Sequence, residues 1–479
     1  MRFAKCSEDK YQAITISITL LAWSGNIPDA ISVIFDTLSS LGEEIPVTMT
    51  PSASQHQFDL TKAILDGITD EALLGYPKME DPSKIMTMQL LVRLSEYLNI
   101  VGDNASLSMC AFKMIQISFM HGMSPLSPMG FAQYGNYLAL FRGDFEGGYR
   151  YVKCALSLMK TMHSRAHDGE IIWYSTHTRL HVEPIQSAVE LYFDGHVAAL
   201  KRGATRYALF ALYYHVVFSF WSGKKLDVFM NSMKQAIKQT KYHKNLMMLE
   251  LMLPLFRVVI NMMDQSVDLE HSDLTNVFGE AHKEGNIAGK LPSHLLTTYF
   301  TRYYEGLIFR DLVKARDSAE KFLTIQKQQS GSTNSTLNPT CYRTFYFGLV
   351  SFWIGRVEGD NNWVAHGVKA KDTFATLAGS VSPWNFQNKL YLLQAEEQFY
   401  RLNFAEAETL YDAAILSSKA HKFVNEEALA NELAGHFYLE TGRRNRSLYY
   451  FSQAFEKYNE WGAVAKANTL TKYFLSSGS

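Results

Sequence analysis

The sequence predicts an all-α fold, a right-handed α-solenoid of helical hairpins, and three observations lead to this prediction. The chain of 479 residues is too long for one compact core. Only 12 residues are Pro while 47% are hydrophobic, a balance that favours long uninterrupted helices. Small and aromatic residues also recur at a spacing of about 40 residues, as expected where helical hairpins stack and the core lengthens with the chain.

The first clear repeat surrounds a turn formed by Gly143, Asp144 and Phe145. Two small residues follow on the next helix, Gly148 near its start and Ala155 further along. Small residues are required where two helix backbones approach closely. We therefore expect the helices on either side of this turn to pack tightly as a hairpin.

The best match to a repeat lies near the C-terminus. Gly435 is placed on a first helix, Gly442 at the turn, and Ser447 and Phe451 on a second helix. The preceding unit has Ala407 in the position of Ser447, about 40 positions earlier. This order of small and aromatic residues is typical of tetratricopeptide repeats, so we expect the solenoid to be tetratricopeptide-like.

Two segments interrupt the helical pattern, residues 45–55 and the polar run that begins at Gln326. The second run, QKQQSGSTNSTLNP, is too polar to bury the apolar area that would offset its chain entropy. We therefore predict a flexible loop at 326–340. It would separate an N-terminal helical array at 1–325 from a C-terminal array at 341–479.

Charge and cysteine content point to a cytoplasmic protein that does not bind nucleic acid. The 46 Lys and Arg residues nearly balance the 47 Asp and Glu residues, so no strong positive field is available for phosphates. The four cysteines are far apart and form no C-x-x-C pair, which is typical of reduced thiols. The start, MRFAKCSEDK, has no apolar segment of a secretory signal.

The most apolar stretch of the sequence is Tyr207–Trp221. It is shorter than the roughly 20 residues that a membrane-spanning helix needs. We expect this stretch to be a buried solenoid helix, and we expect no membrane span.

Two segments are similar to known metal-binding or nucleotide-binding motifs but lack residues that those motifs require. His177 and His181 are four residues apart and Glu183 follows, but Thr178 stands where a zinc-protease helix needs its general base. GNIAGKL at 285–291 is similar to a phosphate-binding P-loop. It has three residues between its glycines where a P-loop needs four, and Leu follows the Lys where a P-loop needs Ser or Thr. We therefore expect neither a metal site nor a nucleotide site here.

Catalytic signatures are also missing from the sequence. It contains no G-x-S-x-G elbow, no H-R-D loop and no D-F-G motif. We expect no catalytic, cofactor-binding or metal-binding residues, no cofactor, and a protein that is not an enzyme. The expected partner is a protein or peptide.

The C-terminal stretch from 382 to 470 contains a set of landmarks, which are Asn385-Phe386, Ala395-Glu396, Leu410-Tyr411-Asp412, the run from Glu427 to Glu432, Phe437-Tyr438-Leu439 and Trp461-Gly462-Ala463. With these landmarks the stretch resembles a helical region of large signalling proteins. In that family a serine/threonine-kinase-like domain and an AAA/STAND-type ATPase precede a tetratricopeptide-like region, and GAF and histidine-kinase domains follow it. Segments 38–46, 76–82 and 133–159 fit the same family.

This resemblance implies a helical sensor or scaffold without catalytic residues. The expected function is a scaffold or adaptor that mediates protein–protein interaction in intracellular signalling. The alternative is a regulatory helical part of a larger ATPase or kinase signalling protein. An ATPase or kinase module, acting in cis or in trans, is then an expected partner.

Overall fold

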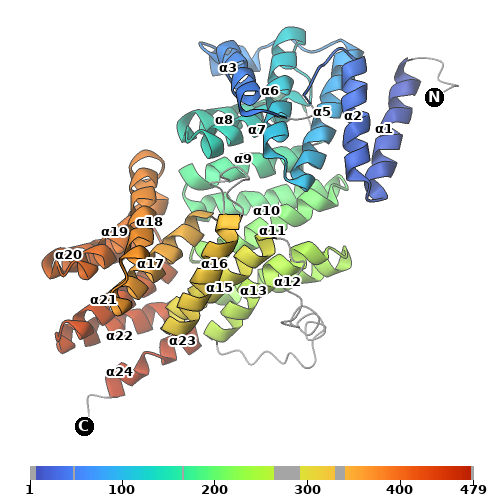
Figure 1. The fold of residues 1–479 in the computed structure, drawn as a ribbon. Coiled ribbons are helices and arrows are strands. Elements are labelled where there is room, and N and C mark those ends of the chain that lie inside the picture. The colour runs from blue at the N-terminus through green and yellow to red at the C-terminus, as the bar shows by residue number, and fades with distance from the viewer. Residues whose placement is uncertain (1–6, 47–48, 164–166, 264–291, 329–339, 476–479) are drawn as a thin grey trace. The chain divides into compact units, whose positions relative to one another are not determined.

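The computed structural model describes residues 7–46, 49–163, 167–263, 292–328 and 340–475. Every regular element in these ranges is an α-helix, and the β contact found there is an isolated bridge between Lys78 and Met123. Successive helices pack as neighbours along the chain (Figure 1). The structure therefore confirms the predicted all-α solenoid.

The chain divides into two compact units, which we describe separately. Unit 1 comprises Met1–Arg179 with Lys201–Gly203, and unit 2 comprises Leu180–Leu200 with Ala204–Ser479. The predicted boundary at 326–340 stays a prediction, because residues 329–339 lie outside the described part of the chain. Helix α16 extends to Gln328, and α17 begins at Thr340.

Unit 1 contains the first helices of the array. Their bounds are α1 Ser7–Trp23, α2 Ile27–Ser40, α3 Pro51–Leu65, α4 Asp70–Leu74, α5 Pro82–Val101, α6 Asn104–His121, α7 Ser127–Phe141, α8 Phe145–Thr161 and α9 Asp168–Val182, of which the last residues belong to unit 2.

Unit 2 contains the remaining described helices. Their bounds are α10 Ile185–Lys201, α11 Thr205–Trp221, α12 Leu226–Tyr242, α13 Leu246–Met263, α15 Pro292–Phe309, α16 Leu312–Gln328, α17 Thr340–Glu358, α18 Asn361–Ser380, α19 Pro383–Tyr400, α20 Phe404–Ala420, α21 Val424–Glu440, α22 Arg444–Trp461, α23 Val464–Asn468 and α24 Thr471–Leu475.

The small residues predicted at hairpin contacts lie where the two helices of a hairpin approach closely. A Cβ atom added to Gly148 on α8 would lie 2.6 Å from the carbonyl oxygen of Gly135 on α7. A Cβ atom added to Gly435 on α21 would lie 2.7 Å from a ring carbon of Phe451 on α22. Neither position has room for a larger side chain, so the expected tight pairing of both hairpins is confirmed.

The turns between helices of unit 2 repeat one backbone motif. Gly223 and Gly442 have left-handed φ values of 80° and 75°, and Leu402 and Lys422 have 62° and 63°. The amide after each of these residues donates to the carbonyl five positions before it, over 2.8–3.2 Å. This is the Schellman geometry of helix ends, which normally takes glycine because a Cβ atom strains it.

Aromatic rings fill the core of unit 1. Phe112 on α6 lies 5.0 Å from Tyr137 and 6.1 Å from Tyr134 between ring centroids, so α6 and α7 interlock. The amide of Gln116 donates to Thr61 over 3.0 Å and ties α6 to α3. Polar bonds of this kind satisfy groups that would otherwise be buried without partners.

Unit 2 has its aromatic centre at Trp221, at the end of α11. Its ring centroid lies 5.3 Å from Phe300, 5.2 Å from Tyr304 on α15, and 5.5 Å and 5.3 Å from Tyr342 and Tyr346 on α17. Three helices distant in sequence therefore meet at one side chain. The predicted buried character of Tyr207–Trp221 is confirmed, because 13 residues of α11 are buried.

One described helix, Leu246–Met263, is long and apolar enough to cross a membrane. Half of its length is buried inside the protein, and it contacts α12, α15 and α23. A core helix of a soluble protein passes the same test, so the finding is weak support for a membrane span.

Candidate functional site

The histidines singled out in the sequence are buried on α9. Nδ1 of His177 lies 2.8 Å from the carbonyl oxygen of Trp173. His181 contacts the ring of Phe386, with 6.4 Å between ring centroids. Across the described ranges, no three His, Cys, Asp or Glu side chains form a group that could hold a metal ion. The segment 285–291, the other candidate, lies outside those ranges.

The described cysteines are unsuited to nucleophilic chemistry. Cys110, Cys154 and Cys341 are free thiols and all three are buried. Burial raises the pKa of Cys341 and of Cys154 to about 12, and it raises the pKa of Cys110 further. A thiol with so high a pKa holds its proton at neutral pH and reacts slowly.

Helix α21 is the most unusual element of unit 2. All of its residues from Asn425 to Tyr438 are buried, although six of them are polar or charged. Buried polar side chains are costly unless they are hydrogen-bonded. The polar side chains of α21 are Asn425, Glu426, Glu427, Asn431, Glu432 and His436.

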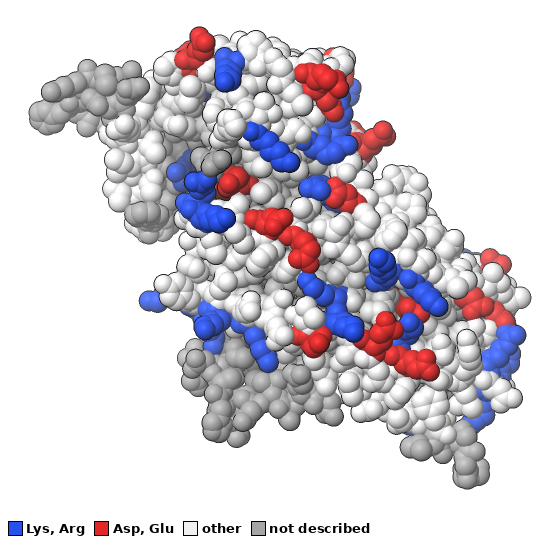
Figure 2. Space-filling model, turned by 180° about the vertical axis from the view of Figure 1, so that it is seen from behind, with Lys and Arg blue, Asp and Glu red and all other residues white. Residues whose placement is uncertain are grey.

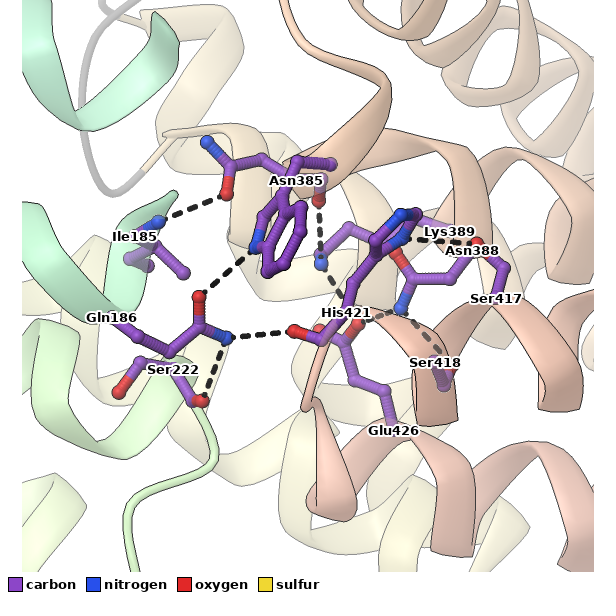
Figure 3. A network of polar contacts seen from close by, with 11 residues as sticks. Ile185, Gln186, Ser222, Asn385, Asn388, Lys389, Ser417, Ser418, His421 and Glu426 are labelled. Carbon is purple, nitrogen blue, oxygen red and sulfur yellow. Dashed lines mark hydrogen bonds and ion pairs between the residues drawn. The ribbon is translucent and has the colours of Figure 1, made fainter. Parts of the chain in front are cut away.

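Glu426 on α21 forms a buried ion pair with Lys389 on α19 (Figure 3). Nζ of Lys389 lies 2.7 Å from Oε2 of Glu426 and donates to the carbonyl of Asn385 over 2.9 Å. The ammonium group also lies 4.1 Å from the ring centroid of Phe423. Asn388 donates to the same carboxylate oxygen and, over 3.1 Å, to Ser418.

Burial perturbs both members of this pair. It lowers the pKa of Lys389 and raises the pKa of Glu426, while the attraction between the two opposes both shifts. Oε1 of Glu426 and Oδ1 of Asn388 have no hydrogen-bond partner among the described atoms. One oxygen of Glu426 therefore accepts from both Lys389 and Asn388, and removal of Lys389 leaves the carboxylate charge in the protein interior.

The side chain of Asn385 fastens the turn between α9 and α10 to α19. Its Oδ1 accepts from the amide of Ile185 over 3.0 Å, at a separation of 200 residues. Its Nδ2 donates to the carbonyl of Glu183 over 2.7 Å and to that of His181 over 3.1 Å. The oxygen and the nitrogen of one side-chain amide therefore both form hydrogen bonds with backbone groups of this buried turn.

Gln186 extends this connection to two further turns. Its Oε1 accepts from Nε1 of Trp384 over 3.1 Å, and its Nε2 donates to the carbonyls of His421 at 3.0 Å and Ser222 at 3.4 Å (Figure 3). One side chain at the start of α10 thus joins the turn after α11 to the turn after α20. The side chain of Gln186 therefore links the start of α10 to segments 198 and 235 positions later in the chain.

A second buried pair lies further along α21. Oε1 of Glu432 lies 2.6 Å from Nζ of Lys466, and its Oε2 accepts from Tyr458 over 2.7 Å. Burial would raise the pKa of Glu432, but Lys466 and His436 outweigh it and hold the pKa at about 2. Burial is the main cause that lowers the pKa of His436 to about 4.

A third cluster joins α17 to α19. Nη1 of Arg356 lies 2.8 Å from Oε2 of Glu396, whose other oxygen accepts from Tyr411 over 2.6 Å. The guanidinium also lies 4.0 Å from the ring centroid of Phe399. Burial lowers the pKa of Arg356, but the field of Glu396 outweighs it and the net shift is upward.

These clusters form a structural network. The buried cation of each cluster contacts a carboxylate of the same cluster. General acid–base catalysis would need a side chain that a substrate can reach. Several landmarks of the family resemblance belong to the network, and Asn385, Glu396, Tyr411 and Glu432 have polar groups bonded in it.

Reasoning from the sequence did not find these pairs. The run VNEEALANEL would ordinarily indicate a solvated helix face, because Glu and Asn are rarely buried. One signal was present, since Glu432 has no Lys or Arg three or four residues away. The partners of Glu426 and Glu432, Lys389 and Lys466, lie 37 and 34 positions away.

Comparison with known proteins does not place the chain in a family. No protein-family model matches the sequence, and no curated protein matches it.

Proposed function

We propose that this protein is a non-catalytic, tetratricopeptide-like scaffold or adaptor of cytoplasmic signalling that binds other proteins. The observation that carries the proposal is the stacking of hairpins from α15–α16 to α21–α22. Such an array presents a long surface in place of a pocket, and its surface is suited to protein segments.

The use of buried charge supports this proposal. Lys389, Glu426, Lys466 and Glu432 are each 1% exposed as side chains and are bonded in pairs. A catalytic group needs contact with substrate, whereas these groups are enclosed by helices of the same unit. Their role is to fix which helices are neighbours, a use of buried polar groups known from other folds.

Surface charge favours a protein partner over nucleic acid. The formal net charge is -1. On the face shown in Figure 2, Lys and Arg side chains are interspersed with Asp and Glu, and the described residues form no broad basic field there. Binding to a phosphate backbone depends on such a field.

Affinity capture tests the proposal. The full-length chain with a C-terminal tag would be used to capture proteins from its native cytosol, with the tag alone as control. We expect specific proteins to be recovered and the purified chain to leave ATP unhydrolysed. ATP turnover by the purified chain, or the recovery of no specific protein, would sink the proposal.

The alternative function is regulation of an ATPase or kinase that acts in cis or in trans. It is favoured by one observation: several residues that carry the family resemblance, among them Asn385, Glu396 and Glu432, also have bonds in the buried network of unit 2. The same capture separates the two functions. Recovery of an ATPase or kinase whose turnover changes on addition of the chain would favour the alternative.

A further inference from the structure

Arg343, near the start of α17, is a half-buried cation on which no carboxylate of the described residues acts. Its Nη2 donates to Oγ1 of Thr297 on α15 over 2.8 Å, and its guanidinium lies 5.8 Å from the ring centroid of Phe300. Its Nε is enclosed by the protein and has no hydrogen-bond partner among the described atoms. A guanidinium has five N–H donors. One bond to a hydroxyl therefore leaves most of this donor capacity unused.

Other enclosed cations of unit 2 are neutralised by carboxylates. Lys389, Lys466 and Arg356 each lie within 2.8 Å of a carboxylate oxygen. Arg310 lies in the attractive field of three glutamates. Arg343 differs from all four, because the groups whose field acts on it are tyrosines.

These tyrosines supply no negative charge at neutral pH. They are Tyr213 and Tyr214 on α11 and Tyr303 on α15. Burial raises the pKa of each phenol, so each keeps its proton. Burial is also the main cause that lowers the pKa of Arg343, although an arginine stays charged at neutral pH. The site therefore has one uncompensated positive charge.

The helices around Arg343 offer no acid to compensate it. α11 contains neither Asp nor Glu. The acids of α15 and α17 are Glu305 and Glu358, which contact Lys314 and Arg316. A desolvated cation without a partner costs stability. An apolar side chain of similar length would favour folding more, so the arginine at this position points to a ligand.

A carboxylate fits these surroundings better than a phosphate. One guanidinium binds one carboxylate through two parallel hydrogen bonds and cancels its single charge. A phosphate monoester has close to two negative charges, and no second cation is among the described groups whose field acts on Arg343. The ring of Tyr214 is half-buried and stacks on Tyr192 and Phe218, with 5.5 Å and 5.9 Å between centroids. This aromatic group matches an apolar body attached to the carboxylate.

We propose that Arg343 binds an organic carboxylate with an apolar body, where α11, α15 and α17 meet. The source of the carboxylate is a free acid or the C-terminus of a protein segment, which share this chemistry. The proposal goes beyond the scaffold function and does not depend on it, because either ligand can bind to a non-catalytic array.

Arg343→Met provides the sharpest test, because it removes the charge and keeps a side chain of similar length. The variant should melt at the same temperature as the wild type or higher, since it removes an unpaired charge. Arg356→Met is the matched comparison. It removes an equal charge from the same helix but leaves Glu396 without its cation, so it should melt lower. Arg302→Met, at an exposed position on α15, is the control for net charge.

The probes are phenylacetate and a short peptide that ends in Phe with a free C-terminus, each titrated into the full-length chain by isothermal calorimetry. Methyl phenylacetate and the C-terminal amide of the peptide are neutral controls and should not bind. We expect Arg343→Met to weaken binding on the order of tenfold or more, and Arg302→Met to leave it unchanged. Arg343→Lys keeps the charge but loses the fork of donors, so it should weaken binding by a smaller factor.

Tighter binding of phenylacetate than of the peptide would assign a free acid as the ligand, and the reverse would assign a protein C-terminus. Four results would overturn the proposal: no binding of either carboxylate, equal binding of the methyl ester, tighter binding of phenyl phosphate, or a melting temperature of Arg343→Met as low as that of Arg356→Met. The last result would give Arg343 a structural role. All four leave the scaffold function standing, because affinity capture tests that function separately.

Discussion

Nζ of Lys389 lies 2.7 Å from Oε2 of Glu426, and each side chain is 1% exposed. Neither residue can reach water if its partner is removed. The contact joins α19 to α21 across 37 positions of sequence. It therefore fixes which hairpin faces which in the C-terminal part of the array.

Lys389→Met is expected to lower the free energy of unfolding by about 3–5 kcal/mol, because it leaves Glu426 buried without a cation. The double variant Lys389→Met with Glu426→Gln should recover most of the lost free energy of unfolding, because no buried charge then remains. Urea unfolding followed by tryptophan fluorescence measures both variants. If the double variant loses as much unfolding free energy as the two single variants lose in sum, the two residues do not stabilise the protein as a pair.

An exposed pair on α3 provides the control for this cycle. Lys62 and Asp66 lie 3.0 Å apart, and their side chains are 56% and 64% exposed. Exposed pairs four residues apart contribute about 0.3–0.5 kcal/mol. Lys62→Met should therefore change the unfolding free energy by no more than about 0.5 kcal/mol.

Asn385→Ala is expected to cost about 3 kcal/mol, because it leaves the amide of Ile185 and the carbonyl of Glu183 without their partner. Hydrogen exchange at the amide of Ile185 should accelerate in the folded variant. Asn459→Ala, which removes a bond from Asn459 to Phe455 within α22, should cost less than about 1 kcal/mol. Equal losses for the two variants would mean that Asn385 has no special role.

The hairpins could be predicted from the sequence because their signals are local. Gly148 and Gly435 mark close contacts between helices that follow one another, and the structure places Gly148 against the backbone of α7 and Gly435 against the ring of Phe451 on α22. The buried pairs could not be predicted. Glu426 and Glu432 form their ion pairs with lysines more than 30 positions away. A helix rich in Glu is predicted to be exposed when the helices around it are unknown.

Gly148→Ala is expected to destabilise unit 1 by about 2 kcal/mol or more, because the new Cβ atom would lie 2.6 Å from a backbone oxygen and 3.0 Å from Ala139. Backbone atoms cannot rotate away as a flexible side chain can. Thermal unfolding measures the effect. The control is Gly379→Ala, at a helical position with nothing within 4 Å, which should be neutral or stabilising by up to about 1 kcal/mol.

Stability is expected to fall as the pH decreases from 6.5 to 4, with His436 as a main cause. Burial lowers the pKa of His436 to about 4, so the folded ring stays neutral in this range while the unfolded ring takes up a proton. The unfolded state therefore binds more protons, and stability is lost with acid by up to about 1 kcal/mol per pH unit. Urea midpoints measured across this range give the slope.

His436→Phe should flatten this slope, because phenylalanine retains the ring contact with Phe451, at 5.0 Å, and has no group to titrate. Glu432→Gln serves as the companion variant. The pKa of Glu432 is held at about 2 against an ordinary value of 4.5, so its contribution is lost only below pH 4.5. The two variants should therefore act in separate pH windows. If His436→Phe leaves the slope between pH 6.5 and 4 unchanged, the loss of stability in acid is caused by other histidines. The burial of His436 would then not be its cause.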